Sequence, residues 1–331
     1  MQLSPQTFKR VAFVAFTALP ASFAFMACAV HSADEWPTAR AIRIVIPSPA
    51  GGPSDIVFRP LAAAMQARLG QAVIIDNKSG ANGNIGAAEV ARAAPDGYTW
   101  LWSTDTVLTV NPHVYKNTGF KPGDLASLNY AARFSQTLVC NPALGFKKLG
   151  DMVQAAQNRP LSYASGGAGS PGHMVMEMLF ASAKVKMTHI PYKGPAPAMQ
   201  DLIGGQVDCG FLAGPTVLPS INAGRLTALA SSGIVRTPLL PNVPTVAESG
   251  YPGFDGTFWL VLAAPKNIPP AIRQRFLAAM QEAIKAPGQQ ERVADIGIEM
   301  VGTTPEQAQA RTEALSRHWG AIASRIQLAV D

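Results

Sequence analysis

Two Gly/Ser-rich loops are the places where this chain could bind an anion. The first, PSPAGGPSD at residues 47–55, follows the β-branched run IRIVI at 42–46 and precedes an apolar-striped segment. The second, GGAGSPG at 166–172, follows LSYAS at 161–165 and also precedes a helical run. Glycines at a strand-to-helix junction let a ligand approach the backbone, and free N–H groups at a helix start favour negative charge. One such loop in each half of the chain predicts an anion held from two sides.

An alternative interpretation makes the second loop part of a serine hydrolase. Residues 168–172, AGSPG, approximate the sharp turn that presents the nucleophile in α/β-hydrolases. Ser170 would be that nucleophile, and Asp295 and His318 follow it in the chain order Ser, Asp, His. Against this, Ala168 replaces the first glycine of the motif, and His318 adjoins an apolar helical stripe where a surface role is more common. A secreted α/β serine hydrolase is therefore the alternative to an anion receptor.

Neither a metal nor a nucleotide cofactor is predicted. The five histidines form no i, i+4 pair, and the cysteines form no C-x-x-C motif. The segment GANGNIG at 80–86 has glycines three residues apart but lacks the G-x-G pair of a dinucleotide-binding turn.

Composition and charge favour a globular chain that does not bind nucleic acid. Of its 331 residues 48% are hydrophobic and 15% charged, which suffices for a large core and two domains. Lys9 and Arg10 are two of the 27 basic residues and no acidic residue precedes Asp34, so the remainder carries 25 basic against 21 acidic residues. The basic residues are scattered, with no run longer than Lys147-Lys148.

The N-terminal segment has the layout of a secretory signal peptide. Lys9 and Arg10 precede an apolar run at 11–25, which small residues follow. The run is too short and too interrupted for a membrane-spanning helix, although an uncleaved anchor is the alternative. We expect cleavage after Ala29, which fits the small-x-small rule better than Ala33, and a periplasmic mature protein.

Three cysteines bear on processing and redox state. Lipidation of Cys28 is not favoured, because Phe25 is a poor start for a lipobox. Cys140 and Cys209 are an even pair in an exported chain, so a disulfide is possible. Because each lies in an apolar strand-like run, we expect two buried free thiols instead.

Strand and helix signals alternate along the whole chain, which predicts an α/β fold with largely parallel sheets. The pattern restarts near residue 137, and residues 257–263 are predicted to be a strand that returns to the first half. Two helices end the chain. The second opens at Thr304, which with Gln307 matches a capping box.

Several segments resemble the Bug receptors, the solute-binding components of tripartite tricarboxylate transporters. PAGGPSDIV at 49–57 is similar to their PPGGSTDIVAR segment. The other similar segments are NGNIG at 82–86, APDGYT at 94–99, VCNP at 139–142, IPYKG at 190–194, GGQVD at 204–208 and PNVPTVAE at 241–248. These motifs occur in order and correctly spaced over the chain after about Trp36.

The resemblance implies a two-domain type II periplasmic-binding-protein (Venus-flytrap) fold and no enzymatic activity. Domain 1 would comprise residues 34–136 and 257–331, and domain 2 residues 137–256, after a signal peptide at 1–29. The protein would be a monomer that captures a small organic carboxylate between the domains and delivers it to an inner-membrane tripartite tricarboxylate permease.

The resemblance also implies which residues contact the ligand. These are Gly51, Gly52, Pro53, Ser54, Ser103, Thr104, Asp105, Ser165, Gly166, Gly169, Ser170, His173, Tyr192, Lys193 and Leu212. Asp55 is expected to be structural instead, and His173 is as well suited to shaping its loop as to touching the ligand.

Two departures from the family pattern bear on ligand identity. Pro53 stands where relatives usually have serine, which removes a hydroxyl and an N–H donor. Leu212 replaces an aspartate that is common in relatives and adds apolar surface. We therefore expect a monoanionic or aromatic carboxylate to fit at least as well as a compact dicarboxylate.

Overall fold

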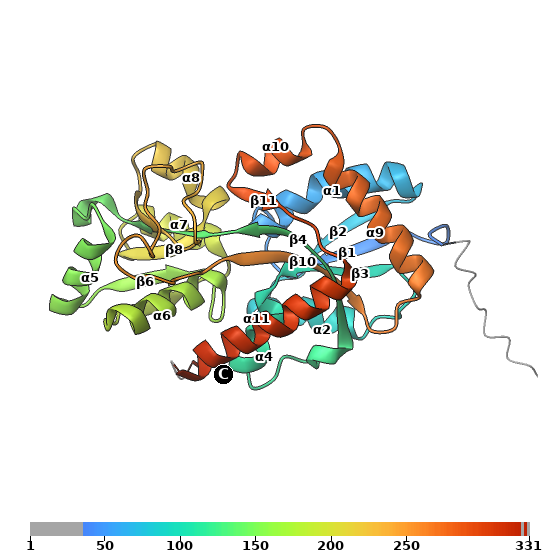
Figure 1. The fold of residues 1–331 in the computed structure, drawn as a ribbon, viewed down its shortest axis with the longest axis horizontal. Helices are drawn as coiled ribbons and strands as arrows, with labels where there is room; N and C mark the ends of the chain where they lie inside the picture. Colours follow the sequence, from blue (N-terminus) through green and yellow to red (C-terminus); the bar gives the residue numbers. More distant parts are fainter. Residues whose placement is uncertain (1–35, 326–327, 330–331) are drawn as a thin grey trace, which may run out of the picture. The chain divides into compact units, whose positions relative to one another are not determined.

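A computed structural model describes residues 36–325 and 328–329, which form two β-sheets flanked by helices (Figure 1). The predicted signal peptide and the two candidate cleavage sites lie outside these residues. No helix in the described ranges combines the length and the hydropathy needed to span a bilayer.

The first sheet contains six strands in the order β11-β4-β10-β3-β1-β2. The strands are β1 (Ile42–Ile46), β2 (Val73–Asn77), β3 (Thr99–Thr104), β4 (Leu125–Phe134), β10 (Phe258–Pro265) and β11 (Ile298–Met300). The helices that accompany it are α1 (Pro53–Leu69), α2 (Asn84–Ala91), α3 (Thr106–Thr109), α4 (Asn111–Val114), α9 (Pro270–Lys285), α10 (Gln289–Ala294) and α11 (Pro305–Arg325), with 3-10 turns η1 (Ala81–Gly83) and η2 (Pro122–Asp124).

The second sheet contains five strands in the order β7-β6-β8-β5-β9. The strands are β5 (Gln136–Cys140), β6 (Ser162–Ser165), β7 (Thr188–Pro191), β8 (Cys209–Ala213) and β9 (Thr227–Ser231). Its helical elements are η3 (Pro142–Leu144), α5 (Leu149–Asn158), α6 (Pro171–Ala183), α7 (Pro195–Ile203) and α8 (Gly214–Asn222).

Both sheets are mixed, so the prediction of largely parallel sheets is wrong in part. β1 pairs in parallel with β2 and β3, and β6 with β7 and β8, whereas β4, β5 and β10 pair antiparallel with their neighbours. The reason is the chain path between the sheets. β4 leads out of the first sheet into β5, and β10 leads back beside β4, so these two strands must run in opposite directions (Figure 1).

The predicted domain boundaries fall beside these crossings. β4 ends at Phe134 and β5 begins at Gln136, while β10 begins at Phe258. The division of the chain at residues 136 and 257 stays a prediction.

Apolar stripes of the last helices pack into the core as the sequence indicates. Phe276 of α9 stacks on Trp100 of β3 with ring centroids 3.8 Å apart, and Trp319 of α11 stacks on Phe258 of β10 at 5.2 Å. The predicted capping box is confirmed, because the Gln307 N–H donates to the Thr304 hydroxyl at 3.3 Å and the Thr304 N–H to Gln307 Oε1 at 3.0 Å.

Cys140 and Cys209 form a disulfide, so the expectation of two free thiols is wrong. The two residues lie directly opposite each other in the antiparallel pair β5–β8, with Cα atoms 4.0 Å apart. Sequence alone could not show this pairing, because the cysteines are 69 residues apart and the register between their strands depends on the whole second sheet.

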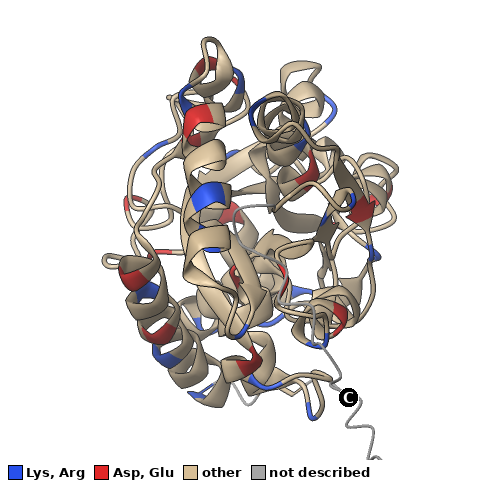
Figure 2. Cartoon of the chain, turned by 90° about the vertical axis from the view of Figure 1, so that its right-hand side faces the viewer, with Lys and Arg blue, Asp and Glu red and all other residues tan. Residues whose placement is uncertain are grey.

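Figure 2 shows Lys and Arg positions interspersed with Asp and Glu positions along the ribbon. The expectation that the chain does not bind nucleic acid stays a prediction.

Candidate functional site

A cavity of about 500 Å³ lies where loops of the two sheets meet, a volume typical of small-molecule sites. Its lining residues are 47–49, 52–54, 79–83, 103, 104, 107, 115, 134, 136, 166–168, 170–172, 192–195 and 211–213. Both Gly/Ser-rich loops singled out in the sequence therefore border the same space, one from each side.

Five helices begin at this cavity without a side-chain cap. The N-cap residues of α1, α2, α6, α7 and α8 are Gly52, Gly83, Ser170, Gly194 and Ala213, and none makes a side-chain capping bond. All five line the cavity. Each helix start presents unpaired N–H groups and the positive end of the helix dipole, so together they favour an anionic ligand.

The charge of the lining agrees with that preference. Among the lining residues, all within the described ranges, Lys193 is the only one that is charged at neutral pH, and it is exposed at the edge. No lining residue is acidic, so nothing in the wall repels a carboxylate.

Two buried hydroxyls in the wall have no hydrogen-bond partner among residues 36–325 and 328–329. They are Ser103 Oγ at the end of β3 and Ser170 Oγ at the start of α6. A buried unpaired hydroxyl is costly, which makes a bound ligand a natural partner for both. Thr104 differs, because its hydroxyl shares a hydrogen bond of 2.9 Å with that of Thr106.

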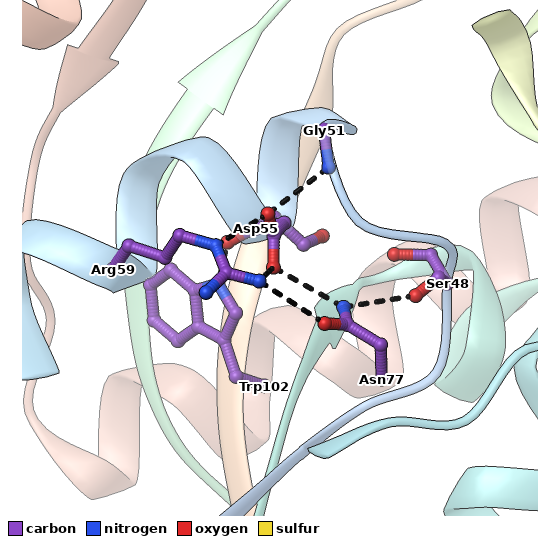
Figure 3. A network of polar contacts seen from close by, with 7 residues as sticks. Ser48, Gly51, Asp55, Arg59, Asn77 and Trp102 are labelled. Atoms are coloured by element: carbon purple, nitrogen blue, oxygen red, sulfur yellow. Dashed lines mark hydrogen bonds and ion pairs between the residues drawn. The ribbon is translucent and has the colours of Figure 1, made fainter. Parts of the chain in front are cut away.

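The first loop is held in shape by the carboxylate of Asp55, which is 2% exposed (Figure 3). Asp55 accepts hydrogen bonds from the Gly51 N–H at 3.0 Å, from Arg59 at 2.8 Å through each of two nitrogens, and from Asn77 at 3.2 Å. Asn77 also donates to the Ser48 carbonyl at 3.1 Å. Burial raises the pKa of Asp55, but these hydrogen bonds outweigh it and hold the pKa below its usual value. Asp55 is therefore a structural group, as predicted.

The second loop is held by two stacked histidines. The rings of His173 and His189 lie 4.0 Å apart, and His173 Nδ1 accepts from the Gly169 N–H at 2.9 Å. His189 Nε2 shares a 2.7 Å hydrogen bond with Ser165 Oγ, which also bonds to both backbone groups of Gly167. These residues shape the loop from behind the cavity wall.

Ten of the predicted contact residues line the cavity: Gly52, Pro53, Ser54, Ser103, Thr104, Gly166, Ser170, Tyr192, Lys193 and Leu212. The remaining five, Gly51, Asp105, Ser165, Gly169 and His173, do not line it. Gly51, Ser165, Gly169 and His173 belong to the two supporting networks just described.

Asp105 was expected to contact the ligand and is wholly buried. Its Oδ1 accepts from the Trp259 N–H at 2.9 Å, which ties the end of β3 to β10. Burial raises the pKa of Asp105 to about 7. Tertiary packing against β10 turns this carboxyl inward.

Sequence reasoning missed several lining residues. The loop 79–83 precedes the NGNIG motif, whose glycines and asparagines were a usable signal. No sequence signal marked four other lining residues, because they enter the wall only through the packing of the two sheets and the crossing of the chain between them. These residues are Tyr115, Phe134, Gln136 and Phe211.

The alternative catalytic triad is not assembled. Ser170 Oγ has no hydrogen-bond partner among the described residues, and His318 lines a different cavity, beside α6 and the turn at 250–254. Asp295 is the C-cap of α10. The geometry therefore gives Ser170 no base.

The stacked histidines predict a pH-dependent stability. Burial lowers the pKa of His173 to about 3, with a smaller contribution from His189, and burial lowers the pKa of His189 to about 4. The unfolded chain takes up these protons below the ordinary value of 6.5, whereas the folded protein does not. The contribution of the two histidines to the free energy of unfolding should therefore decrease as pH falls from about 6.5 towards 4. The raised pKa of Asp105 acts in the opposite direction over this window.

Urea unfolding at several pH values should show a shallower slope over this window for His173→Gln and for His189→Gln. His113→Gln, at an exposed position on α4, controls for the removal of an imidazole. An unchanged slope in both buried variants would contradict the assignment of neutral, buried imidazoles.

The chain is similar to a family of transport receptors. The family model described as "Tripartite tricarboxylate transporter family receptor" matches residues 57–328. The periplasmic binding protein BugD is 32% identical, with a TM-score of 0.83 and coverage of 88% of this chain and 99% of that one.

Two further similar structures are complexes with small carboxylates. Rpa4515 of R. palustris with adipate is 32% identical, with a TM-score of 0.85 and coverage of 89% of this chain and 99% of that one. MatC of Rhodopseudomonas palustris with bound malate is 28% identical, with a TM-score of 0.80 and coverage of 86% and 99%. These matches confirm the two-domain binding-protein fold predicted from the sequence, and the chain belongs to the receptor family of the tripartite tricarboxylate transporters.

Proposed function

We propose that this receptor captures a small organic carboxylate outside the cytoplasmic membrane and delivers it to a tripartite tricarboxylate-type permease. The observation that carries the proposal is the cavity at which five uncapped helix starts meet two hydroxyls that have no partner among the described residues, with no acidic side chain in the lining. The related structures described with adipate and with malate, both carboxylates, support the same ligand class. The receptor would act as a monomer.

Recognition would rest on neutral donors rather than on a cluster of charges. A carboxylate oxygen can accept hydrogen bonds from N–H groups at the helix starts and from Ser103 and Ser170, which approach from the two sheets. Each charge-assisted hydrogen bond contributes about 1.5–3 kcal/mol. Lys193 at the edge would attract the anion and add one cation close to it.

The wall also has an apolar side, which bears on the choice of ligand. Phe134, Phe211 and Leu212 line the cavity, and Pro53 offers no N–H at the start of α1. A second carboxylate in contact with this side would lose hydrogen bonds, whereas a ring or an alkyl chain would gain apolar contact. We therefore propose that a monoanionic or aromatic carboxylate binds at least as well as a compact dicarboxylate.

The hydroxyl pair gives a direct test of the binding site. Ser103→Ala and Ser170→Ala should each weaken carboxylate binding by about tenfold to a hundredfold, because each removes one hydrogen bond to a charged group. Calorimetry against adipate, malate and benzoate measures this loss. Thr216→Val is the matched control, since the Thr216 hydroxyl is also buried, has no partner in the described part of the chain, and lies outside the cavity.

Unchanged affinity in both serine variants would refute the proposed site. Ester hydrolysis that disappears in Ser170→Ala would instead support the hydrolase alternative.

The apolar side gives a second test. Pro53→Ser restores a hydroxyl and an N–H, and Leu212→Asp removes apolar surface, so each should shift preference away from benzoate-like ligands in the same calorimetric panel. For Pro53→Ser we expect about a tenfold gain for succinate-like ligands. If the wild type already prefers succinate and Pro53→Ser leaves that affinity unchanged, the argument from these two positions fails.

One mass measurement tests both the removal of the signal peptide and the formation of the disulfide. The mature protein should lack residues 1–29 and should be lighter by two hydrogens for the disulfide between Cys140 and Cys209. Intact mass of material from a periplasmic fraction, before and after reduction, tests both statements. A mass that retains Lys9 and Arg10, or that includes a lipid on Cys28, would contradict a soluble periplasmic receptor.

A further inference from the structure

One hydrogen bond joins the two walls of the cavity directly. The Tyr115 hydroxyl, at the end of α4 on the side of the first sheet, donates to the Ala168 carbonyl in the Gly-rich loop before α6 at 2.9 Å. Both residues line the cavity. Burial raises the pKa of Tyr115, so its hydroxyl stays protonated and available as a donor.

A group of asparagines forms a rigid platform beside this bond. Asn82 donates to Asn111 Oδ1 at 2.8 Å, and Asn111 donates to the Asn82 carbonyl at 3.0 Å and to Asn84 Oδ1 at 2.7 Å. Asn84 and Asn111 are buried. These three hydrogen bonds tie the asparagines together, while Asn84 Nδ2 has no partner among the described residues.

The Gly-rich loop lies against this platform at Gly169. A Cβ atom placed there would come within 3.1 Å of Asn82 Nδ2, 3.4 Å of Tyr115 Cε2 and 3.5 Å of Asn111 Oδ1. Gly169 also has a φ of +75°, which a side chain rarely adopts. The close approach of the loop to the platform thus requires glycine.

We propose that Tyr115, seated on the asparagine platform, is a positioning residue that fastens the Gly-rich loop over a bound ligand and so sets how slowly the ligand leaves. The inference rests on the proposed receptor function. The fastened loop carries Ser170, two residues beyond Ala168, so a ligand held by Ser170 cannot leave through this side while the Tyr115 bond is made. The bond exists only when the two walls are together, so its energy favours the closed form alone.

The first test needs no ligand. Donor and acceptor dyes on Gln66→Cys in α1 and Gln154→Cys in α5, both exposed positions, report the separation of the two sheets by single-molecule energy transfer. Tyr115→Phe removes only the hydroxyl and should lower the ratio of closed to open molecules about two- to tenfold, as expected for one neutral hydrogen bond. Tyr251→Phe, which changes a tyrosine that lines a different cavity, should leave the ratio unchanged.

A glycine pair tests the platform in the same assay. Gly169→Ala should also open the molecule, because the added methyl meets the platform. Gly145→Ala is the matched control, since Gly145 has a φ of +73° and nothing lies within 4 Å of an added Cβ. The control carries the same backbone strain without the contact.

The second test measures how fast bound adipate and malate, used as probes, dissociate from the protein. Tyr115→Phe should release a bound probe about two- to tenfold faster in stopped-flow displacement, with its association rate unchanged. If neither probe nor any carboxylate of the panel binds the wild type, the proposed function fails. The energy-transfer measurement without ligand still tests whether the Tyr115 hydrogen bond holds the two walls together. Energy-transfer distributions that coincide for wild type, Tyr115→Phe and Gly169→Ala would overturn the inference.

Discussion

The site depends on helix starts whose N–H groups are left free. A serine, threonine or aspartate cap normally satisfies one of these donors; an alanine in its place costs about 0.5–2 kcal/mol and a glycine about a few tenths of a kcal/mol. At the cavity α1, α2, α6, α7 and α8 start without such a bond, as α9 and α10 do elsewhere in the fold, whereas α11 is capped by Thr304 and Gln307. Ser170 occupies an N-cap position yet leaves its hydroxyl unpaired. The local loss of stability is what makes the donors available to an anion.

Loops that leave donors free must be held by something else, and buried polar networks behind the wall do this. Asp55 fixes the first loop through the Gly51 N–H, and His173 fixes the second through the Gly169 N–H. In both cases a side chain four residues further along the chain, in the first turn of the helix, reaches back to a glycine N–H of the loop. The two loops therefore share one design: glycine supplies the approach to the ligand, and a buried side chain fixes the backbone.

Much of this could be predicted from sequence because the loop signal is local. Gly52, Ser54 and Ser170 were recognised from the strand, glycine and helix pattern around them, and a family resemblance carried the prediction to Tyr192 and Lys193. What failed depends on contacts distant in sequence. Asp105 is turned inward by β10, the disulfide depends on the register of β5 and β8, and Phe134 and Gln136 reach the cavity only because the chain crosses between sheets there.

The position of that crossing links binding to the relative movement of the sheets. Phe134 ends β4 and Gln136 begins β5, and both line the cavity, so a ligand would touch the connection as well as the walls. A ligand bonded to Ser103 on one side and Ser170 on the other makes more contacts when the walls are close, and it must therefore favour the closed form. A receptor of this construction needs no separate switch. The difference in contacts between its open and closed forms is itself the signal that a partner can read.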